Sequence, residues 1–513
     1  MSRTDVVVLG GGLNGLAAAV RLARDGRRVT LVEARDAVGG LAAAEEFHPG
    51  FRSPGVLHDT DAVSPDLAEA LGLPRRGLRF RPARQAAFHG DGAGRVIRVP
   101  SEDDASSAPT APDDRTAWSE RAAFLGRVRP FLASILDRAP PPLAPESLAG
   151  WMGILGLGVR ARRLGEADLL ELARVLPMCV ADWQNEAFAD PLLKAAFAAT
   201  ALEASFLGPW SGGTTALLLL REARAGRGVV GGAPAVVAAL AEEAERAGVD
   251  VVRGRRATRI VVERGAARAV ELDGADPIDA AAVLSTLDPR TTLLDLIEPS
   301  RVPPSLADAA RVYRMRGTTA KLDLALDGAP PFPDPPGGGP IALYRTGAEL
   351  DALERAFDAA KYGRCSDPPL LEIHVPTHES PELAPAGRHV ASVLVHFAPF
   401  ALDGGWSDGA RERLEAAVLA EFDRHAPGVR DRVVGARLRT PADLAGEFGL
   451  TGGHLHHGEH APDQLLSLRP SFRCGEYRTP IAGLWLGGGG THPGGGLSGR
   501  PGLLAAEALA ARS

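Results

Sequence analysis

Residues 5–40 read DVVVLGGGLNGLAAAVRLARDGRRVTLVEARDAVGG, and this stretch decides the expected fold class. The unbroken apolar run at 6–9 predicts a strand that is buried on both faces. A glycine-rich turn and a helix-periodic segment follow as far as Gly26, and a second apolar run at 29–32 ends on Glu33. The order strand, helix, strand predicts a Rossmann-like α/β unit with a parallel sheet.

The glycine-rich turn has the spacing of a dinucleotide-binding fingerprint. Gly10 allows the tight turn, Gly12 allows a pyrophosphate to approach the backbone, and Gly15 allows the helix to pack closely on the strand. Free N–H groups at the helix N-terminus favour bound phosphate, and Glu33 stands where an acid accepts hydrogen bonds from a ribose. The predicted contacts in this unit are Gly10, Gly12, Leu13, Asn14, Gly15, Glu33 and Ala34.

A glycine pair, Gly39-Gly40, follows Glu33 six residues later. This extended pattern resembles that of FAD enzymes of the glutathione-reductase type, in which a glycine pair follows the ribose acid. The resemblance implies FAD rather than NAD, and it adds Gly39 and Gly40 to the expected cofactor contacts.

Composition narrows the class of protein. The chain has 513 residues, of which 45% are hydrophobic and 24% charged, enough for a large core and about two domains. A net charge of −7 argues against a nucleic-acid partner. The three cysteines, Cys179, Cys365 and Cys474, form no C-x-x-C pair, which argues against a redox dithiol or a zinc site.

The chain is expected to be cytoplasmic, because its start leads directly into the nucleotide fold and no run of 18 apolar residues occurs. The segment WMGILGLGVRARRLG (151–165) combines apolar residues with arginines. We expect a buried cap helix with a charged end here. The alternative is an amphipathic surface for peripheral membrane contact or for entry of an apolar substrate.

Strand and helix patterns typical of a nucleotide-binding domain return in the middle of the chain and again at its C-terminal end. This predicts a discontinuous FAD-binding domain of residues 1–75, 225–295 and 445–513, and an inserted α+β substrate domain of residues 76–224 and 296–444. Within the latter, 165–224 has helical spacing. Polar residues 101–117 predict a surface insertion, and proline-rich stretches at 139–146 and 329–340 predict connectors.

Five stretches carry a family resemblance across nearly the whole chain. The chain resembles the phytoene-desaturase-like branch of the amine-oxidase flavoprotein superfamily, and within it the group of pyridine nucleotide-disulfide oxidoreductase domain-containing protein 2. Despite that name, the missing C-x-x-C implies no disulfide chemistry. The stretches are EEFHPGFRSPGVLHD (45–59), MCVADWQNEAFADPLLKAAF (178–197), GPWSGGT (208–214), GGHLHHGEHAPDQLLSLRP (452–470) and YRTPIAGLWLGGGGTHPGGGLSGRPG (477–502).

The last of these stretches predicts a second cofactor element. Its glycines allow close backbone approach, and the helix after Ser498 is expected to direct its N-terminus toward the cofactor. The resemblance places this loop at the flavin ring and implies contacts from Gly488, Gly495, Gly496 and Leu497. A glycine-rich turn with no cofactor contact is the alternative.

Two residues are candidates for catalysis. Lys321 lies in GTTAKLDLAL (317–326), on the strand face opposite the leucines. The resemblance to amine oxidases implies that it holds a water at flavin N5, whereas the alternative is an exposed strand lysine. His492 is expected beside the flavin, with a hydrogen bond that stabilises the turn as an equal alternative.

Other histidines are candidates for the substrate pocket. His454 and His457 belong to a cluster that we expect to form a polar pocket wall rather than a metal site, since no acid or cysteine set lies at ligand spacing. His456, in the same cluster, departs from the family pattern, in which an aromatic residue is usual. His58 follows the first glycine pair and is a candidate for the pocket, although a capping or loop role is the favoured interpretation.

These features predict an FAD-dependent dehydrogenase or oxidase. It would transfer hydride from a largely apolar small molecule to flavin N5, form a double bond, and pass electrons to oxygen or a quinone. No second fingerprint for a nicotinamide cofactor occurs. A flavin amine oxidase and a redox-neutral isomerase are the alternatives within this class, and a non-enzymatic prenyl- or lipid-binding escort protein is the alternative outside it.

Overall fold

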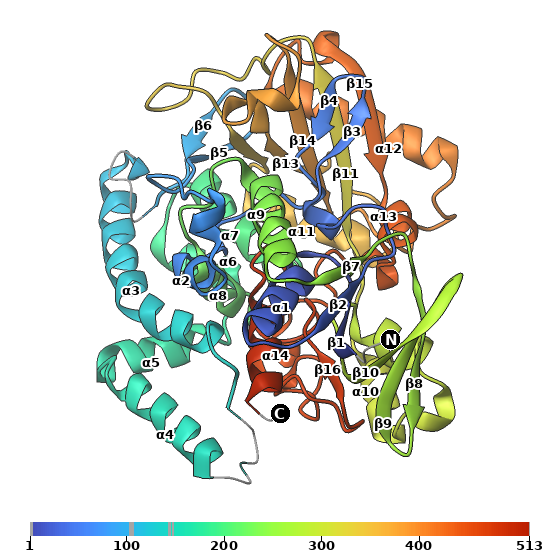
Figure 1. The fold of residues 1–513 in the computed structure, drawn as a ribbon. Coiled ribbons are helices and arrows are strands. Elements are labelled where there is room, and N and C mark those ends of the chain that lie inside the picture. The colour runs from blue at the N-terminus through green and yellow to red at the C-terminus, as the bar shows by residue number, and fades with distance from the viewer. Residues whose placement is uncertain (1–3, 102–106, 142–144, 146–147, 512–513) are drawn as a thin grey trace.

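The computed structural model describes residues 4–101, 107–141, 145 and 148–511. Its first sheet is mainly parallel (Figure 1). The strand order is β7 (Asp250–Val252), β2 (Val29–Val32), β1 (Thr4–Leu9), β10 (Ala275–Ser285), β9 (Ala266–Leu272) and β8 (Ala257–Glu263), with β16 (Leu484–Leu486) paired to β10. The long strand β10 connects the parallel and antiparallel parts, because its first half pairs antiparallel with β9 and its second half pairs in parallel with β1.

The apolar run at the start of the chain is buried on both faces of this sheet, as the sequence predicted. Val6 and Val8 pack in the cluster with helices α1 (Leu13–Arg24), α9 (Gly232–Arg246) and α14 (Arg500–Ala510). Val7 and Leu9 pack on the opposite side with residues of β8, β9 and α10 (Pro304–Val312). Burial of both faces explains why the run has no polar alternation.

A second sheet lies at the other end of the molecule (Figure 1). The strand order is β15 (Val433–Arg439), β11 (Thr319–Leu326), β14 (His389–His396), β13 (Leu370–His374), β12 (Leu343–Thr346), β5 (Ala87–Gly90) and β6 (Val96–Arg98). The leucine face of β11 packs against α12 (Asp408–His425). A two-stranded ribbon, β3 (Glu45–His48) with β4 (Phe51–Ser53), lies beside β14 and β15.

Helices cover one side of the molecule and share their own apolar cluster. The predicted helical region 165–224 forms four helices, α5 to α8. The remaining helices are α2 (Pro65–Ala70), α3 (Pro112–Leu136), α4 (Leu148–Arg162), α5 (Glu166–Val175), α6 (Val180–Ala187), α7 (Pro191–Ala201), α8 (Thr214–Arg224), α11 (Leu350–Lys361) and α13 (Pro441–Phe448).

The expected surface insertion at 101–117 is partly wrong, because α3 begins at Pro112. Proline at the first turn and the acids Asp113 and Asp114 there are favourable at a helix N-terminus, so the residues interpreted as a loop are helix-start residues. Asp114 also accepts hydrogen bonds from the N–H groups of Ala189 and Asp190. Residues 102–106 of the insertion, and 142–144 and 146 of the next connector, lie outside the described residues.

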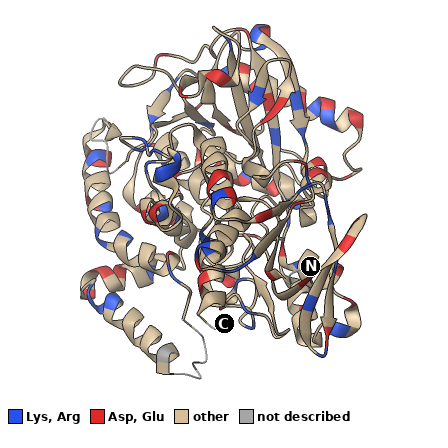
Figure 2. Cartoon of the chain, in the orientation of Figure 1, with Lys and Arg blue, Asp and Glu red and all other residues tan. Residues whose placement is uncertain are grey.

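The expectation of a buried cap helix at 151–165 is also wrong. Trp151, Met152, Leu155 and Val159 of α4 are exposed, at the spacing of one helix face. Figure 2 shows that α4 carries no acidic residue, and its basic residues lie at its C-terminal end. In the described ranges, no helix is long and apolar enough to cross a membrane.

Helices α1 and α14, from opposite ends of the chain, pack tightly against each other (Figure 1). A Cβ added at Gly502 would lie 1.9 Å from the carbonyl oxygen of Asn14, so only glycine allows this approach. The contact fixes the C-terminal helix beside the glycine-rich turn.

We predict that Gly502→Ala destabilises the protein by about 1–3 kcal/mol, because the added methyl group forces α14 away from α1. Equilibrium unfolding in urea measures the change. Gly446→Ala in α13 is the matched control, since a Cβ there meets nothing within 4 Å, and it should be neutral or slightly stabilising. Equal stability of the two variants would contradict the prediction.

Candidate functional site

The glycine-rich turn after β1 leaves open space where a side chain would otherwise stand. Gly10 has a φ of +93°, and a Cβ at Gly15 would lie 1.8 Å from the Gly10 carbonyl oxygen. At Gly12, in contrast, a Cβ would meet nothing within 4 Å. Gly12 precedes α1 with no side-chain cap, so the first N–H groups of this helix are free to bind an anion.

The glycine pair lies directly against this turn. Gly39 donates its N–H to the Gly11 carbonyl at 2.8 Å, and a Cβ at Gly40 would lie 3.2 Å from the Gly12 Cα. The pattern that suggested FAD therefore brings two glycine segments together beside the N-terminus of α1.

Glu33 is held by backbone at the end of β2. Its Oε2 accepts the N–H of Gly11 at 2.7 Å, and its Oε1 accepts the N–H of Arg35 at 2.8 Å. Each carboxylate oxygen keeps a second lone pair for a hydroxyl group.

A first cavity of about 650 Å³ follows the carboxyl ends of four parallel strands. It begins at the turn after β1, passes Glu33 after β2 and Thr286 after β10, and reaches Gly489 after β16. Ligands of open α/β sheets bind at this edge. The predicted residues that line it are Gly10, Gly12, Leu13, Asn14, Glu33, Ala34, Gly39, Gly40, His457, Gly495, Gly496 and Leu497.

Two predicted cofactor glycines do not line this cavity. Gly15 packs against Gly10, and a Cβ at Gly488 would lie 2.3 Å from the Thr286 carbonyl oxygen. Both glycines allow close backbone packing behind the cavity. Sequence analysis also missed Arg255 and Arg256, which line the cavity from the segment just before β8 and belong to no motif.

Arg469 fixes the loops at the far end of the first cavity. Its guanidinium is fully buried, and its five N–H donors make six contacts of 2.8–3.3 Å with five backbone carbonyls, because the two hydrogens of Nη2 are shared among three of them. The acceptors are the carbonyls of His456, Gly458, Glu459, Gln464 and Gly489. One side chain thereby joins the 456–464 loop to the loop after β16.

Glycines allow the loop after β16 to pack closely against the 456–464 loop and against Pro289. A Cβ at Gly495 would lie 2.4 Å from the His456 Cβ, and one at Gly490 would lie 2.4 Å from Pro289. Gly496, with a φ of +107°, has nothing within 4 Å of its Cβ position and lines the cavity. The C-terminal glycine loop therefore both packs against the histidine loop and leaves room for a ligand.

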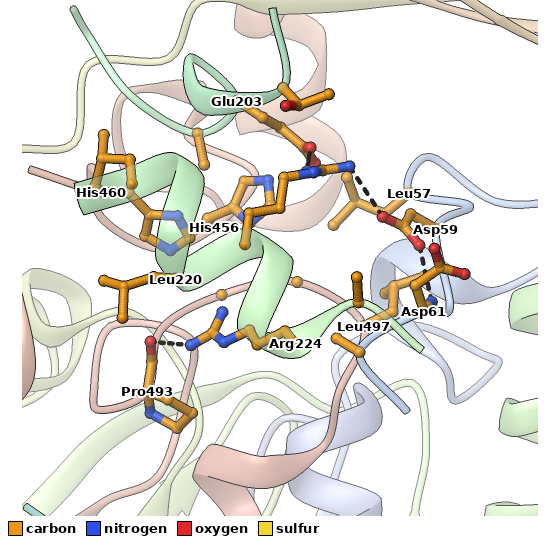
Figure 3. Close-up of a pocket in the computed structure, with 18 of the residues that line it drawn as sticks. Leu57, Asp59, Asp61, Glu203, Leu220, Arg224, His456, His460, Pro493 and Leu497 are labelled. Carbon is orange, nitrogen blue, oxygen red and sulfur yellow. Dashed lines mark hydrogen bonds and ion pairs between the residues drawn. The ribbon is translucent and has the colours of Figure 1, made fainter. Parts of the chain in front are cut away.

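A second cavity, of about 110 Å³, meets the first at Leu57, His456 and the segment 495–497 (Figure 3). Its wall includes the end of α8, with Leu217, Leu220 and two arginines. No phenylalanine, tyrosine or tryptophan of the described chain lines it. A third cavity, of about 280 Å³, shares seven lining residues with the second: His58, Asp59, Asp61, Arg84, Thr200, Arg221 and Glu372.

Charged residues in the second cavity are mostly paired. Arg84 pairs with Asp61 at 3.4 Å and with Glu222 at 3.1 Å. Arg221 pairs with Asp59 and with Glu203. Burial raises the pKa of Asp61 to about 7, and the charge of Asp59 contributes in the same direction.

His58 lines both the second and third cavities. Its Nε2 lies 3.1 Å from Glu372 Oε1, and Arg345 donates to the other Glu372 oxygen at 2.6 Å. Burial alone would raise the pKa of Glu372, but Arg345 and His58 outweigh it and hold this pKa well below its ordinary value.

The histidine cluster divides between cavity wall and loop support. His457 lines the first cavity, and His456 lines both cavities. His454 lines none of the three, because its Nδ1 accepts the N–H groups of His456 and Gly458. A further histidine, His460, lines the second cavity.

The two catalytic candidates lie away from these cavities. Lys321 is on the strand face opposite the leucines, as predicted, but it is fully buried rather than exposed. It donates to Ser392 and pairs with Asp323 at 3.7 Å. His492 Nε2 lies 3.1 Å from the carbonyl oxygen of Ile135, near the end of α3, and burial lowers the pKa of His492 to about 3. A catalytic role for either residue stays a prediction.

Comparison with known proteins gives the family. Residues 13–434 match the model of the flavin containing amine oxidoreductases. The chain belongs to this family. It is therefore an oxidoreductase with FAD as cofactor, which excludes the escort-protein alternative.

Relatives are similar over nearly the whole chain. Pyridine nucleotide-disulfide oxidoreductase domain-containing protein 2 of Rattus norvegicus is 29% identical and covers 98% of this chain and 92% of its own. Hydroxyneurosporene desaturase of Rhodobacter capsulatus is 29% identical and covers 97% and 95%. Cyclohexylamine oxidase from Brevibacterium oxydans shares the fold, with a TM-score of 0.58 at 16% identity over 99% of this chain and 98% of its own.

Features of the first cavity fit FAD. Open space at Gly12 and Gly496 leaves room for a ligand against the backbone, and the side-chain oxygen of Asn14 is buried without a partner. A buried polar atom of this kind is normally satisfied by a ligand or water. With Glu33 and the free N-terminus of α1, this donor and acceptor set suits a dinucleotide.

We predict that Glu33→Ala lowers FAD retention at least tenfold, because it removes the carboxylate at the ribose position and frees the Gly11 N–H. The ratio of flavin to protein absorbance after gel filtration measures retention. Asp36→Ala removes the same charge three residues further on, at an exposed position outside the cavity lining, and should retain FAD. Equal retention in the two variants would exclude a role for Glu33.

Arg469→Met should destabilise the protein by more than about 3 kcal/mol and weaken FAD binding, since it leaves five carbonyls without their donor. Thermal unfolding with and without added FAD measures both effects. Arg473→Met, at an exposed position, should behave like the parent protein. A normal melting temperature for Arg469→Met would show that the loops hold together without this side chain.

Proposed function

We propose that this chain is an FAD-dependent dehydrogenase or oxidase that transfers a hydride from one carbon of a largely apolar small molecule to FAD, while the adjacent carbon loses a proton that passes to solvent, so that a carbon–carbon double bond forms. The junction of the two cavities carries this proposal. At Leu57, His456 and the segment 495–497, a ligand in the second cavity would lie directly against a ligand in the first.

In this proposal FAD occupies the first cavity. The pyrophosphate would lie at Gly12 and the N-terminus of α1, and the adenosine ribose at Glu33. The flavin ring would lie at Gly495, Gly496 and Leu497, where it faces the second cavity. FAD supplies the hydride acceptor when bound, and oxygen or a quinone would remove the electrons afterwards.

The chain's own contribution is orientation and exclusion of water. Leucines at 57, 136, 217, 220, 465 and 497 give the second cavity an apolar wall that suits a hydrocarbon portion of the substrate. The name of the desaturase relative supports this reaction type.

Amine oxidation is the second candidate, supported by the family and by the amine-oxidase fold relative. An aromatic cage is a common device for recognising a cationic nitrogen. Among the described residues, no phenylalanine, tyrosine or tryptophan lines the second cavity, so we favour formation of a carbon–carbon double bond over amine oxidation.

We predict that the purified protein has a visible flavin band, which an apolar substrate from a panel of polyenes and apolar carboxylic acids bleaches anaerobically and amines do not. Stopped-flow absorbance measures the reduction, and admission of air or a quinone measures reoxidation. Bleaching by amines alone would favour the amine-oxidase alternative. An isomerised product formed only after dithionite reduction would favour the isomerase, and absence of the band after addition of FAD would contradict the proposal.

A further inference from the structure

Arg224 differs from the other arginines of the second cavity. Arg84 and Arg221 are each neutralised by two carboxylates, as described above. Among the described residues no carboxylate lies within ion-pair distance of Arg224, whose one hydrogen-bond acceptor is the Pro493 carbonyl. Asp137, the acid that most favours its charge, pairs instead with Arg500 at 3.0 Å.

The surroundings of Arg224 are positive. Burial and the neighbouring charge of Arg469 lower the pKa of Arg224 to about 10, with smaller contributions from Arg221 and Arg500. The guanidinium therefore remains charged at neutral pH, in a place where further positive charge is unfavourable and an anion is favoured. Figure 3 shows its side chain directed toward Pro493 and away from Asp59 and Asp61.

Unpartnered imidazole nitrogens lie in the same wall. His456 is 93% buried, and its Nδ1 has no hydrogen-bond partner. His460 Nε2 also has no hydrogen-bond partner. It lies 2.8 Å from the position of a Cβ on Gly494, and Gly494 follows Pro493, whose carbonyl accepts the Arg224 hydrogen bond. Buried polar atoms without partners are costly, so a polar ligand group here would relieve that cost.

We propose that the second cavity binds the carboxylate group of an otherwise apolar substrate, with Arg224 as its counter-ion. The planar guanidinium presents several N–H donors in the geometry that a carboxylate accepts. His456 and His460 supply the adjacent polar wall, and the leucines receive the hydrocarbon part. The substrate class is thus a carboxylic acid with an apolar chain or ring, rather than a pure hydrocarbon.

This assignment rests on the proposed function, because it takes the second cavity as the substrate site. It also sets the orientation of the substrate. The carboxylate at Arg224 lies beside Pro493, and the neighbouring residues Gly495–Leu497 face the first cavity. A carbon close to the carboxylate is therefore the one nearest to the flavin position.

The test uses the FAD-loaded protein with octanoate as probe and 1-octanol as its uncharged analogue. Isothermal titration and perturbation of the flavin spectrum measure binding to the parent protein, Arg224→Gln and Arg224→Lys. Arg227→Gln is the matched control, because it removes one positive charge three residues further on, at an exposed position outside the cavity lining.

We expect octanoate to bind the parent protein and Arg227→Gln with equal affinity, and Arg224→Gln about 10- to 100-fold more weakly. Arg224→Lys should give an intermediate affinity, and all variants should retain FAD. Octanol should bind every variant alike. Equal octanoate binding by the parent and Arg224→Gln, or no preference of the parent for octanoate over octanol, would overturn the proposal.

The outcome separates this inference from the proposed function. If octanoate binds through Arg224 but no apolar substrate reduces the flavin anaerobically, the carboxylate site stands and the dehydrogenase function fails. If uncharged polyenes reduce the flavin and carboxylates bind no better than alcohols, the function stands and the carboxylate site is wrong.

Discussion

The candidate site depends on the hydrogen bonds that the buried guanidinium of Arg469 donates to backbone carbonyls. A positive charge inside a protein is costly unless hydrogen bonds replace its hydration, and here five backbone carbonyls do so. These carbonyls belong to two loops, in which Gln464 ends a short 3-10 helix (Pro462–Gln464) and the other four acceptors lie outside helices and strands. The same contacts that satisfy the arginine therefore set the distance between His456 and Gly489, and so the wall that the two cavities share.

Close backbone packing is the second constraint around this wall. Gly15, Gly488 and Gly495 each lie where a Cβ would overlap another backbone or side-chain atom. Gly12 and Gly496, in contrast, face open space. Glycine thus serves two physical purposes in one cofactor region: at some positions it lets protein pack on protein, and at others it leaves room for a ligand. Sequence spacing alone does not separate the two.

Much of the cofactor region could be predicted because its signals are local. Hydrophobic runs, the turn glycines and Glu33 are consecutive in the chain, and the physics of a strand–turn–helix unit fixes where they lie. Lys321 and His492 show the limit. Alternation of apolar and polar residues correctly gave the strand face of Lys321. It could not show that the Lys321 ammonium group would donate to Ser392 on the neighbouring strand and pair with Asp323, two residues away in the chain. Nor could the sequence pattern show that the carbonyl of Ile135, near the end of α3, would form a hydrogen bond with His492 Nε2.

By itself the sequence determined the α/β class, the dinucleotide-binding fingerprint and the position of the acid after the second strand, because these follow from short-range periodicity and backbone geometry. The choice of FAD over NAD came from the resemblance of the glycine pair to that of FAD enzymes. Only the tertiary structure decided which distant side chains meet. Arg224 lies outside the stretches that carry the resemblance, and Arg469 lies inside one of them (452–470) without being marked by it; both are arginines among many. Their roles depend on which carboxylates and carbonyls surround them after folding, since the environment of a buried charge is set by long-range contacts rather than by its neighbours in the chain.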